Sequence, residues 1–177
     1  DLTRQRAHWV DRNTIAWRVR YRDGDTVRLH CSADGALELT ADGMVGGESF
    51  DLTRGGDLSA AVLARLPHLA GYAAFGLSDE DASRAPELLK GQVAASVSGP
   101  DGKMKNATGV QIPGVLDDLF FYDGPLGVNW NEGAPAFSVW APTAQRVWVH
   151  IYETSTAPEP LHVLSATEEN GVWTLVG

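Results

Sequence analysis

The sequence predicts an all-β protein with short helical decorations, and three observations support that prediction. Apolar and polar residues alternate with a period of two in about ten short runs, which is the spacing of half-buried strands. Glycine, proline and Asp-Gly pairs separate these runs, as they do in tight turns. Helical spacing occurs in only a few brief segments. Many short strands joined by turns are typical of β-sheets packed face to face.

The first strands are predicted close to the N-terminus. Residues 8–10 and 14–17 form two strands around a turn. Residues 27–31 alternate between apolar and polar side chains, and Asp34-Gly35 then favours a tight turn. Residues 37–40 continue the alternation. We therefore expect 37–40 to pair with 27–31 as a hairpin.

The segment between Asp57 and Pro67 changes to helical spacing. Leu58, Val62 and Leu66 recur every four residues, which places them on one face of a helix. Asp57 is expected to cap this helix, because its carboxylate can accept N–H groups of the first turn. Pro67 is expected to end the helix.

The next elements follow from turn signals and short apolar repeats. They are a short helix at 86–90, strands at 93–97 and 106–112 around a turn at 99–102, and a helical turn at 115–121.

Glycine and proline are then concentrated at residues 122–127, and hairpin character restarts after them, which predicts a domain junction. A strand at 128–130, a turn at 131–133 and a strand from Ala136 form the next hairpin. The last strands are expected at 161–164 and 172–176.

Residues 137–152 are the most informative stretch of the chain. They contain two alternating runs around Pro142, which lacks an N–H and so interrupts a ladder. One face of these runs carries the apolar side chains Phe137, Val139, Val147, Val149 and Ile151. The opposite face carries Trp140, Trp148 and Tyr152. Large aromatic side chains on an outer face indicate a binding surface.

The pattern F-x-V-W-A-P-x-A followed by V-x-V-x-x-Y in this stretch resembles the start of carbohydrate-binding module family 48. That module precedes the catalytic barrel in α-glucan-debranching hydrolases of the pullulanase and limit-dextrinase type. The first part of the chain resembles the β-sandwich that lies before this module in the same enzymes. The segments that carry this second resemblance are 7–10 with 14–17, 66–72, 89–92, 107–119 and 122–127.

The resemblance implies two consecutive immunoglobulin-like β-sandwich domains, at 1–124 and 125–177, with the second truncated at its C-terminal end. About 50 residues are few for an independent core, so we expect an unpaired strand edge in the second domain. The family's catalytic barrel needs roughly 250 residues and does not occur in this sequence. We therefore expect a non-catalytic N-terminal accessory region.

The absent barrel would hydrolyse α-1,6-glucosidic branches in pullulan, amylopectin, glycogen or limit dextrins. Two alternatives stay open, a free-standing α-glucan-binding module and a structural or adhesive β-sandwich without sugar binding.

The outer aromatic side chains Trp140, Trp148 and Tyr152 have two candidate uses. Aromatic rings stack on the apolar C–H faces of sugars, so the three residues could bind α-glucan. They could instead dock on another domain, including the catalytic barrel of the same polypeptide. Docking is favoured, because similar sugar-binding modules carry a further tryptophan element and residues 153–160 contain none. Core packing is expected for Trp9 and Trp17, and packing within the last hairpin for Trp173.

No catalytic or metal-binding residue is predicted. The adjacent acidic pairs Asp79/Glu80, Asp117/Asp118 and Glu168/Glu169 are expected to be solvated, and the five histidines lack ligand spacing. No cofactor is expected. Calcium has two weak candidate positions, at Asp23-Gly24-Asp25 and at residues 79–81.

Composition limits the partners. The net charge is −9 and the pI is about 4.9, so an acidic surface disfavours nucleic acid. No apolar run approaches the roughly 20 residues needed to span a bilayer, so no membrane is expected. Residues 1–6 have no apolar segment behind them and do not indicate a signal peptide. Secreted and cytoplasmic locations both stay open.

Overall fold

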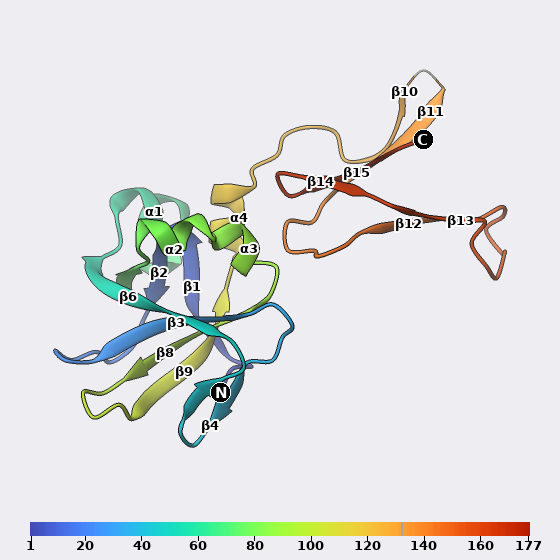
Figure 1. Ribbon diagram of the computed structural model, residues 1–177. Helices are drawn as coiled ribbons and strands as arrows, with labels where there is room; N and C mark the ends of the chain where they lie inside the picture. The colour runs from blue at the N-terminus through green and yellow to red at the C-terminus, as the bar shows by residue number, and fades with distance from the viewer. Residues whose placement is uncertain (132) are drawn as a thin grey trace. The chain divides into compact units, whose positions relative to one another are not determined.

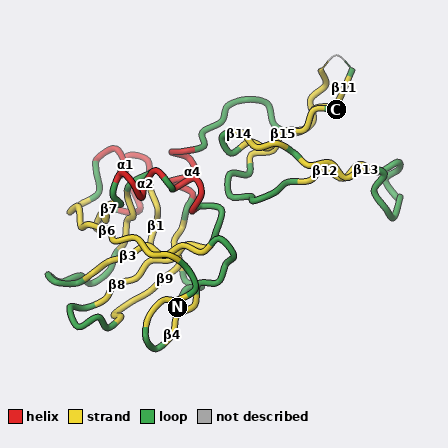
Figure 2. The backbone as a smooth tube through the Cα atoms, viewed as in Figure 1, coloured by secondary structure: helices red, strands yellow, loops and turns green. Residues whose placement is uncertain are grey.

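The computed structural model describes residues 1–131 and 133–177, and strands dominate it (Figures 1 and 2). The chain divides into two compact units, which we call unit 1 (Asp1–Leu119) and unit 2 (Phe120–Gly177). The prediction of a β-rich, sandwich-type fold with short helices is confirmed. The domain ranges 1–124 and 125–177 stay a prediction. No helix within the described residues is long and apolar enough to cross a membrane.

Unit 1 is built around one continuous sheet. Its strands run in the order β1-β2-β7-β6-β3-β8-β9, and β1 pairs in parallel with β9, so the ladder closes on itself. Unit 1 has nine strands in all, the seven of this sheet and two more, β4 and β5, that pair with each other. They are β1 (Gln5–Asp11), β2 (Thr14–Trp17), β3 (Thr26–Ser32), β4 (Glu38–Thr40), β5 (Gly43–Val45), β6 (Glu48–Asp57), β7 (Ala73–Gly76), β8 (Gln92–Ser98) and β9 (Met104–Gln111). Its helices are α1 (Ala60–Arg65), the 3-10 turn η1 (Pro67–Leu69), α2 (Asp79–Ser83), α3 (Ala85–Leu88) and α4 (Pro113–Leu119).

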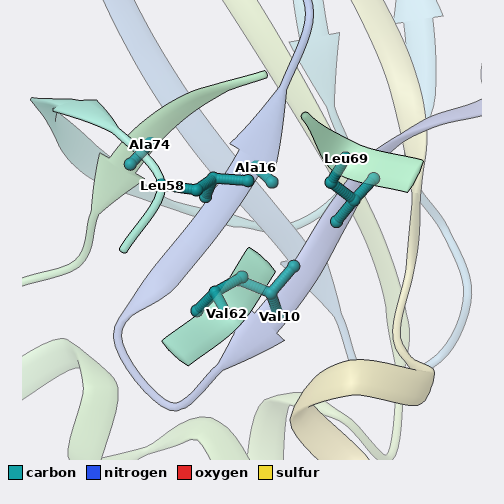
Figure 3. Packing of buried hydrophobic residues seen from close by; sticks show 6 residues of the cluster. All are labelled: Val10, Ala16, Leu58, Val62, Leu69 and Ala74. Carbon is teal, nitrogen blue, oxygen red and sulfur yellow. The ribbon is translucent and has the colours of Figure 1, made fainter. Parts of the chain in front are cut away.

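Both faces of strands β1 and β2 are buried. Trp9 and Trp17 are 0% and 2% exposed, as predicted for core residues. Their neighbours Val10 and Ala16 point to the opposite face, because successive strand residues alternate. A second apolar cluster covers that face, and Figure 3 shows its members from β1, β2, β7, α1 and η1. The cluster consists of Val10, Ala16, Leu58, Val62, Leu69 and Ala74. Helix α1 therefore closes the outside of the sheet.

The predicted cap of this helix was wrong. Asp57 is the last residue of β6 and pairs with Ala73, so its backbone is still extended. The helix begins at Ala60, and its N-cap is Ser59, whose Oγ accepts the Val62 N–H at 3.2 Å. A serine at the N-cap satisfies a helix N–H that has no partner within the helix.

The predicted hairpin of 27–31 with 37–40 was also wrong. Both edges of β3 are occupied, by β6 on one side and β8 on the other. Strand β4 instead pairs with β5 in a separate two-stranded ladder. The turn itself is present, since Gly35 has φ of +75° and the Ser32 hydroxyl donates to Asp34 at 2.6 Å. Local turn chemistry was correct, but more distant strands compete for β3.

Unit 2 contains two separate sheets. Its strands are β10 (Gly127–Asn131), β11 (Ala134–Trp140), β12 (Trp148–Ile151), β13 (His162–Ser165), β14 (Thr167–Glu169) and β15 (Val172–Val176). Four of them form a sheet in the order β10-β11-β15-β14, and within the described part of unit 2 β12 pairs only with β13. The predicted unpaired edges are therefore present. The predicted turn at 131–133 includes Glu132, which lies outside the described residues.

Candidate functional site

The outer face of β12 and of the residue that follows it carries two of the three aromatic residues that the sequence singled out, Trp148 and Tyr152. The side chains of this run alternate in exposure, as a strand with one wet face requires. The half-buried set is Val147, Val149 and Ile151, and the exposed set is Trp148, His150 and Tyr152.

Trp148 and Tyr152 present large ring surfaces to solvent. Trp148 is 57% exposed and Tyr152 is 46% exposed. The guanidinium of Arg146 lies 5.8 Å from the centroid of the Trp148 ring. A cation over an indole stabilises that arrangement by about 0.5–1 kcal/mol at an exposed site. Arg146 thus favours one orientation of the exposed ring.

Trp140 is placed differently from the other two aromatic residues. It lies at the end of β11, which belongs to a different sheet from β12. Its indole N–H donates to the carbonyl oxygen of Phe120 at 2.7 Å, and its cross-strand partner is the buried Val172. Trp140 therefore anchors the first residue of unit 2, and the structure does not bring it onto the surface that Trp148 and Tyr152 share.

The face predicted as the core of unit 2 lines an open apolar cavity of about 310 Å³. Phe137 and Val139 from β11 form one wall, and Val149 from β12 lies on another. Val139 remains 45% exposed, so this face is only half covered. Alternation predicted which side chains share the face. The alternation in the sequence does not indicate how completely other side chains cover that face.

Trp173 forms a buried wall of the same cavity. It is 8% exposed and lies opposite Val139 in the β11–β15 ladder. Its indole N–H donates to the Ala141 carbonyl at 3.0 Å, which ties the ring to the break between β11 and β12. The expectation that Trp173 packs within its own hairpin stays a prediction, because these contacts join it to β11 and Ala141. Its position at the back of a cavity was not predicted.

Three acidic side chains of unit 1 accept hydrogen bonds that lower their pKa values. A retaining glycosidase needs two carboxyl groups roughly 5–5.5 Å apart, one of them with a raised pKa. Here a hydrogen bond from Lys105 lowers the pKa of Asp25, and one from Ser32 lowers the pKa of Asp34. The Arg84 guanidinium lowers the pKa of Glu48 in the same way.

The candidate acidic pairs and calcium positions serve local structure. Asp118 accepts the backbone N–H of Arg12 at 3.0 Å, and Glu168 accepts that of Gly171 at 2.7 Å. Asp25 is held by Lys105 at 2.5 Å, and Asp81 by the cap hydroxyl of Ser78 at 2.8 Å. Within residues 1–131 and 133–177, no group of three or more His, Cys, Asp or Glu side chains could hold a metal ion. The expectation of no cofactor stays a prediction.

Cys31 and His30 are buried in β3 of unit 1. Burial raises the pKa of the Cys31 thiol to about 12, which disfavours a thiolate nucleophile. His30 lies 2.8 Å from the Ser96 hydroxyl, and burial lowers its pKa to about 4. Both groups are packed inside the sheet.

Two family models match the chain in sequence order. Residues 4–118 match the Pullulanase N2 domain, and residues 125–177 match carbohydrate-binding module 48, the isoamylase N-terminal domain. The closed domain of unit 1 thus matches one domain family, and the half-open unit 2 matches a carbohydrate-binding module family. The chain belongs to the Pullulanase N2 domain family.

Whole pullulanases are similar to this chain over nearly its full length. Pullulanase 1, chloroplastic, from Arabidopsis thaliana is 35% identical over 99% of the chain, and a pullulanase from Klebsiella pneumoniae is 35% identical over 97%. The chain spans only 18% and 16% of these two relatives.

Solved structures give the same result. The apo pullulanase of Klebsiella pneumoniae matches 99% of this chain with a TM-score of 0.88 and 32% identity, over 19% of its own length. A Klebsiella pneumoniae pullulanase complexed with maltotriose matches 99% of this chain, also at a TM-score of 0.88 and 32% identity, over 17% of its own length. The chain thus corresponds to the N-terminal domains of much longer enzymes.

Proposed function

We propose that this chain is the non-catalytic N-terminal accessory region of a pullulanase-type enzyme. In this proposal, a catalytic barrel in the same polypeptide hydrolyses α-1,6-glucosidic branches of pullulan, amylopectin, glycogen or limit dextrins. The two family matches, in order and covering almost all of the chain, support the assignment.

The open cavity of unit 2 is the observation that carries the docking role. An apolar hollow of about 310 Å³ with Val139 half exposed costs free energy in water. Further polypeptide of the same enzyme would cover this face and remove that cost. Unit 2 would then brace the barrel, with Trp148 at the margin of the contact.

The coding sequence beyond Gly177 tests this function directly. A barrel of roughly 250 residues downstream supports the proposal. A reading frame that stops without such a barrel contradicts it and favours a free-standing module. The isolated chain should also release no maltotriose from pullulan, and measurable release would locate catalysis in this segment.

Glucan binding by Trp148 and Tyr152 is a second candidate role. Their exposed rings are suited to the C–H faces of sugars, and the Arg146 guanidinium lies 5.8 Å from the centroid of the Trp148 ring. The relative complexed with maltotriose makes an α-glucan the natural probe. In an affinity gel containing amylopectin or pullulan, the isolated chain should be retarded and Trp148→Ala should migrate faster. Migration of both proteins at the rate of a non-binding control would exclude this role.

A further inference from the structure

A second cavity lies in unit 1, where strands β8 and β9 diverge. The two strands lie side by side and pair from Ser98 with Met104 as far as Ala94 with Gly109 (Figure 1). Beyond that point Gln92 and Val93 pair with β3, whereas β9 continues along β1. A cavity of about 440 Å³ occupies the resulting fork. We call it the fork cavity.

The fork cavity has an unusual lining for this chain. None of its ten lining residues is charged, although 21% of the chain is charged. Three of the four glutamines in the sequence, Gln5, Gln92 and Gln111, line it. Amide side chains both donate and accept hydrogen bonds, whereas an uncharged lining offers nothing to balance an ion. The lining therefore selects a neutral, hydroxyl-rich ligand.

Hydrogen bonds to the backbone orient two of the three amides. The Gln92 Oε1 accepts the backbone N–H of Leu37 at 3.0 Å. The Gln111 Nε2 donates to the Gln5 carbonyl oxygen at 2.8 Å. A primary amide has two donors and two acceptor lone pairs, so each group keeps further capacity for a ligand. Fixed amides lose less side-chain entropy when they bind.

The remaining wall is apolar and comes from Leu2, Ile112 and Pro113. A pyranose ring has hydroxyls around its edge and C–H groups on its faces. Its binding site therefore needs both polar groups for the hydroxyls and an apolar wall for a ring face. The volume of the fork cavity lies within the roughly 300–1,000 Å³ range of small-molecule sites. Amides beside an aliphatic wall therefore match a saccharide better than a purely apolar or an ionic ligand.

Two sequence segments that resemble the enzyme family converge on the fork cavity. Segment 89–92 supplies Gly91, and segment 107–119 supplies Gly109. A Cβ on Gly91 would lie 2.3 Å from the Ser32 carbonyl oxygen, and one on Gly109 would lie 2.6 Å from that of Leu2. These glycines let neighbouring backbones approach closely and so hold the walls of the fork in place.

We propose that the fork cavity of unit 1 is a binding site for a short neutral oligosaccharide, separate from the aromatic surface of unit 2. The amides of Gln5, Gln92 and Gln111 bind the hydroxyls, and the wall at Ile112 and Pro113 contacts the ring face. The choice of an α-glucan as ligand rests on the proposed function, whereas the saccharide class follows from the lining.

The test is an NMR titration of the ¹⁵N-labelled chain with maltotriose. Maltotriose should change the chemical shifts of the backbone amide resonances of Gln92, Val93, Val110 and Gln111. Gln111→Leu should raise the dissociation constant for these shifts about fivefold, the effect of one lost hydrogen bond. Gln145→Leu, which changes the fourth glutamine in unit 2, is the matched control and should leave the constant unchanged.

The outcomes separate this proposal from the function of unit 2. Shifts confined to the region of Trp148 would overturn the fork site and leave the glucan-binding role of unit 2 standing. Shifts in the fork that survive Trp148→Ala support the fork site alone. If Gln111→Leu fails to fold, Gln5→Leu keeps the backbone carbonyl that Gln111 uses and tests the same wall. An unchanged constant in folded Gln5→Leu and Gln111→Leu would exclude the proposal.

Discussion

The large apolar side chains on the closed sheet of unit 1 are mostly enclosed, whereas several of those in unit 2 remain half covered. In unit 1, Trp9 and Phe75 are 0% exposed, inside a sheet whose ladder closes on itself. In unit 2, Val128 is 55% exposed and Val139 45%, both on the four-stranded sheet, and among the described residues no ladder joins this sheet to the β12–β13 pair. The same alternation of strand residues thus produces a closed core in one region and an open cavity in the other. Alternation assigns a side chain to a face, and the number of available strands decides whether that face is covered.

The largest expected effect contrasts one tryptophan from each unit. Trp9→Ala should lower the free energy of unfolding by about 3–5 kcal/mol, because it leaves a cavity in a closed core. Trp148→Ala should change it by less than about 0.5 kcal/mol, because the ring is already exposed. Urea denaturation followed by circular dichroism measures both. An equal decrease in the free energy of unfolding in the two variants would contradict the contrast between the units.

The second effect is acid destabilisation of unit 1 through His30. Burial, with a smaller contribution from Arg28, lowers its pKa from 6.5 to about 4. The unfolded chain therefore binds a proton between these pH values that the folded chain excludes. The free energy of unfolding should be highest above pH 6.5 and fall by on the order of 1 kcal/mol per pH unit towards pH 4.

The variant His30→Gln checks the source of this slope. It keeps a polar group near the Ser96 hydroxyl but cannot be protonated. Its unfolding energy should vary less between pH 6.5 and 4 than that of the unmodified chain. Some slope should remain, because burial, with a smaller contribution from His68, also lowers the pKa of His8. Superimposable pH profiles of the variant and the unmodified chain would show that His30 is not responsible.

The smallest effect concerns the helix that covers the outer face of unit 1. Ser59→Ala should cost about 1 kcal/mol because it removes the bond to the Val62 N–H. Asp57→Ala is the matched control and should cost less, since Asp57 ends a strand and caps nothing. Thermal unfolding of the two variants distinguishes them. A larger loss in Asp57→Ala would restore the cap that the sequence suggested.

Sequence patterns identified most of the strands, and their failures have physical causes. The strands at 93–97 and 106–112 were correct because a connection of only five residues, 99–103, joins two strands that pair with each other. The partner of 37–40 was wrong because pairing of β3 is decided by strands distant in sequence.

The candidate site was predictable only in part. Alternation correctly separated the outward Trp148 and Tyr152 from the half-buried side of β12. It could not show that Trp140 would be held by the backbone of Phe120, because that contact joins residues from separate segments. The fork cavity was not predicted either, since its three glutamines come from β1, β8 and β9. Spacing within one segment carries no information about such convergence.

Hydrogen exchange tests most directly the claim that unit 2 needs a cover and unit 1 does not. The measurement compares the isolated chain with the longer enzyme proposed above, residue by residue. Amides in the centre of β3 and β8 should be equally protected in both proteins, whereas those of β12 and β13 should exchange much more slowly in the longer enzyme. Equal protection of β12 and β13 in the two proteins would contradict the account.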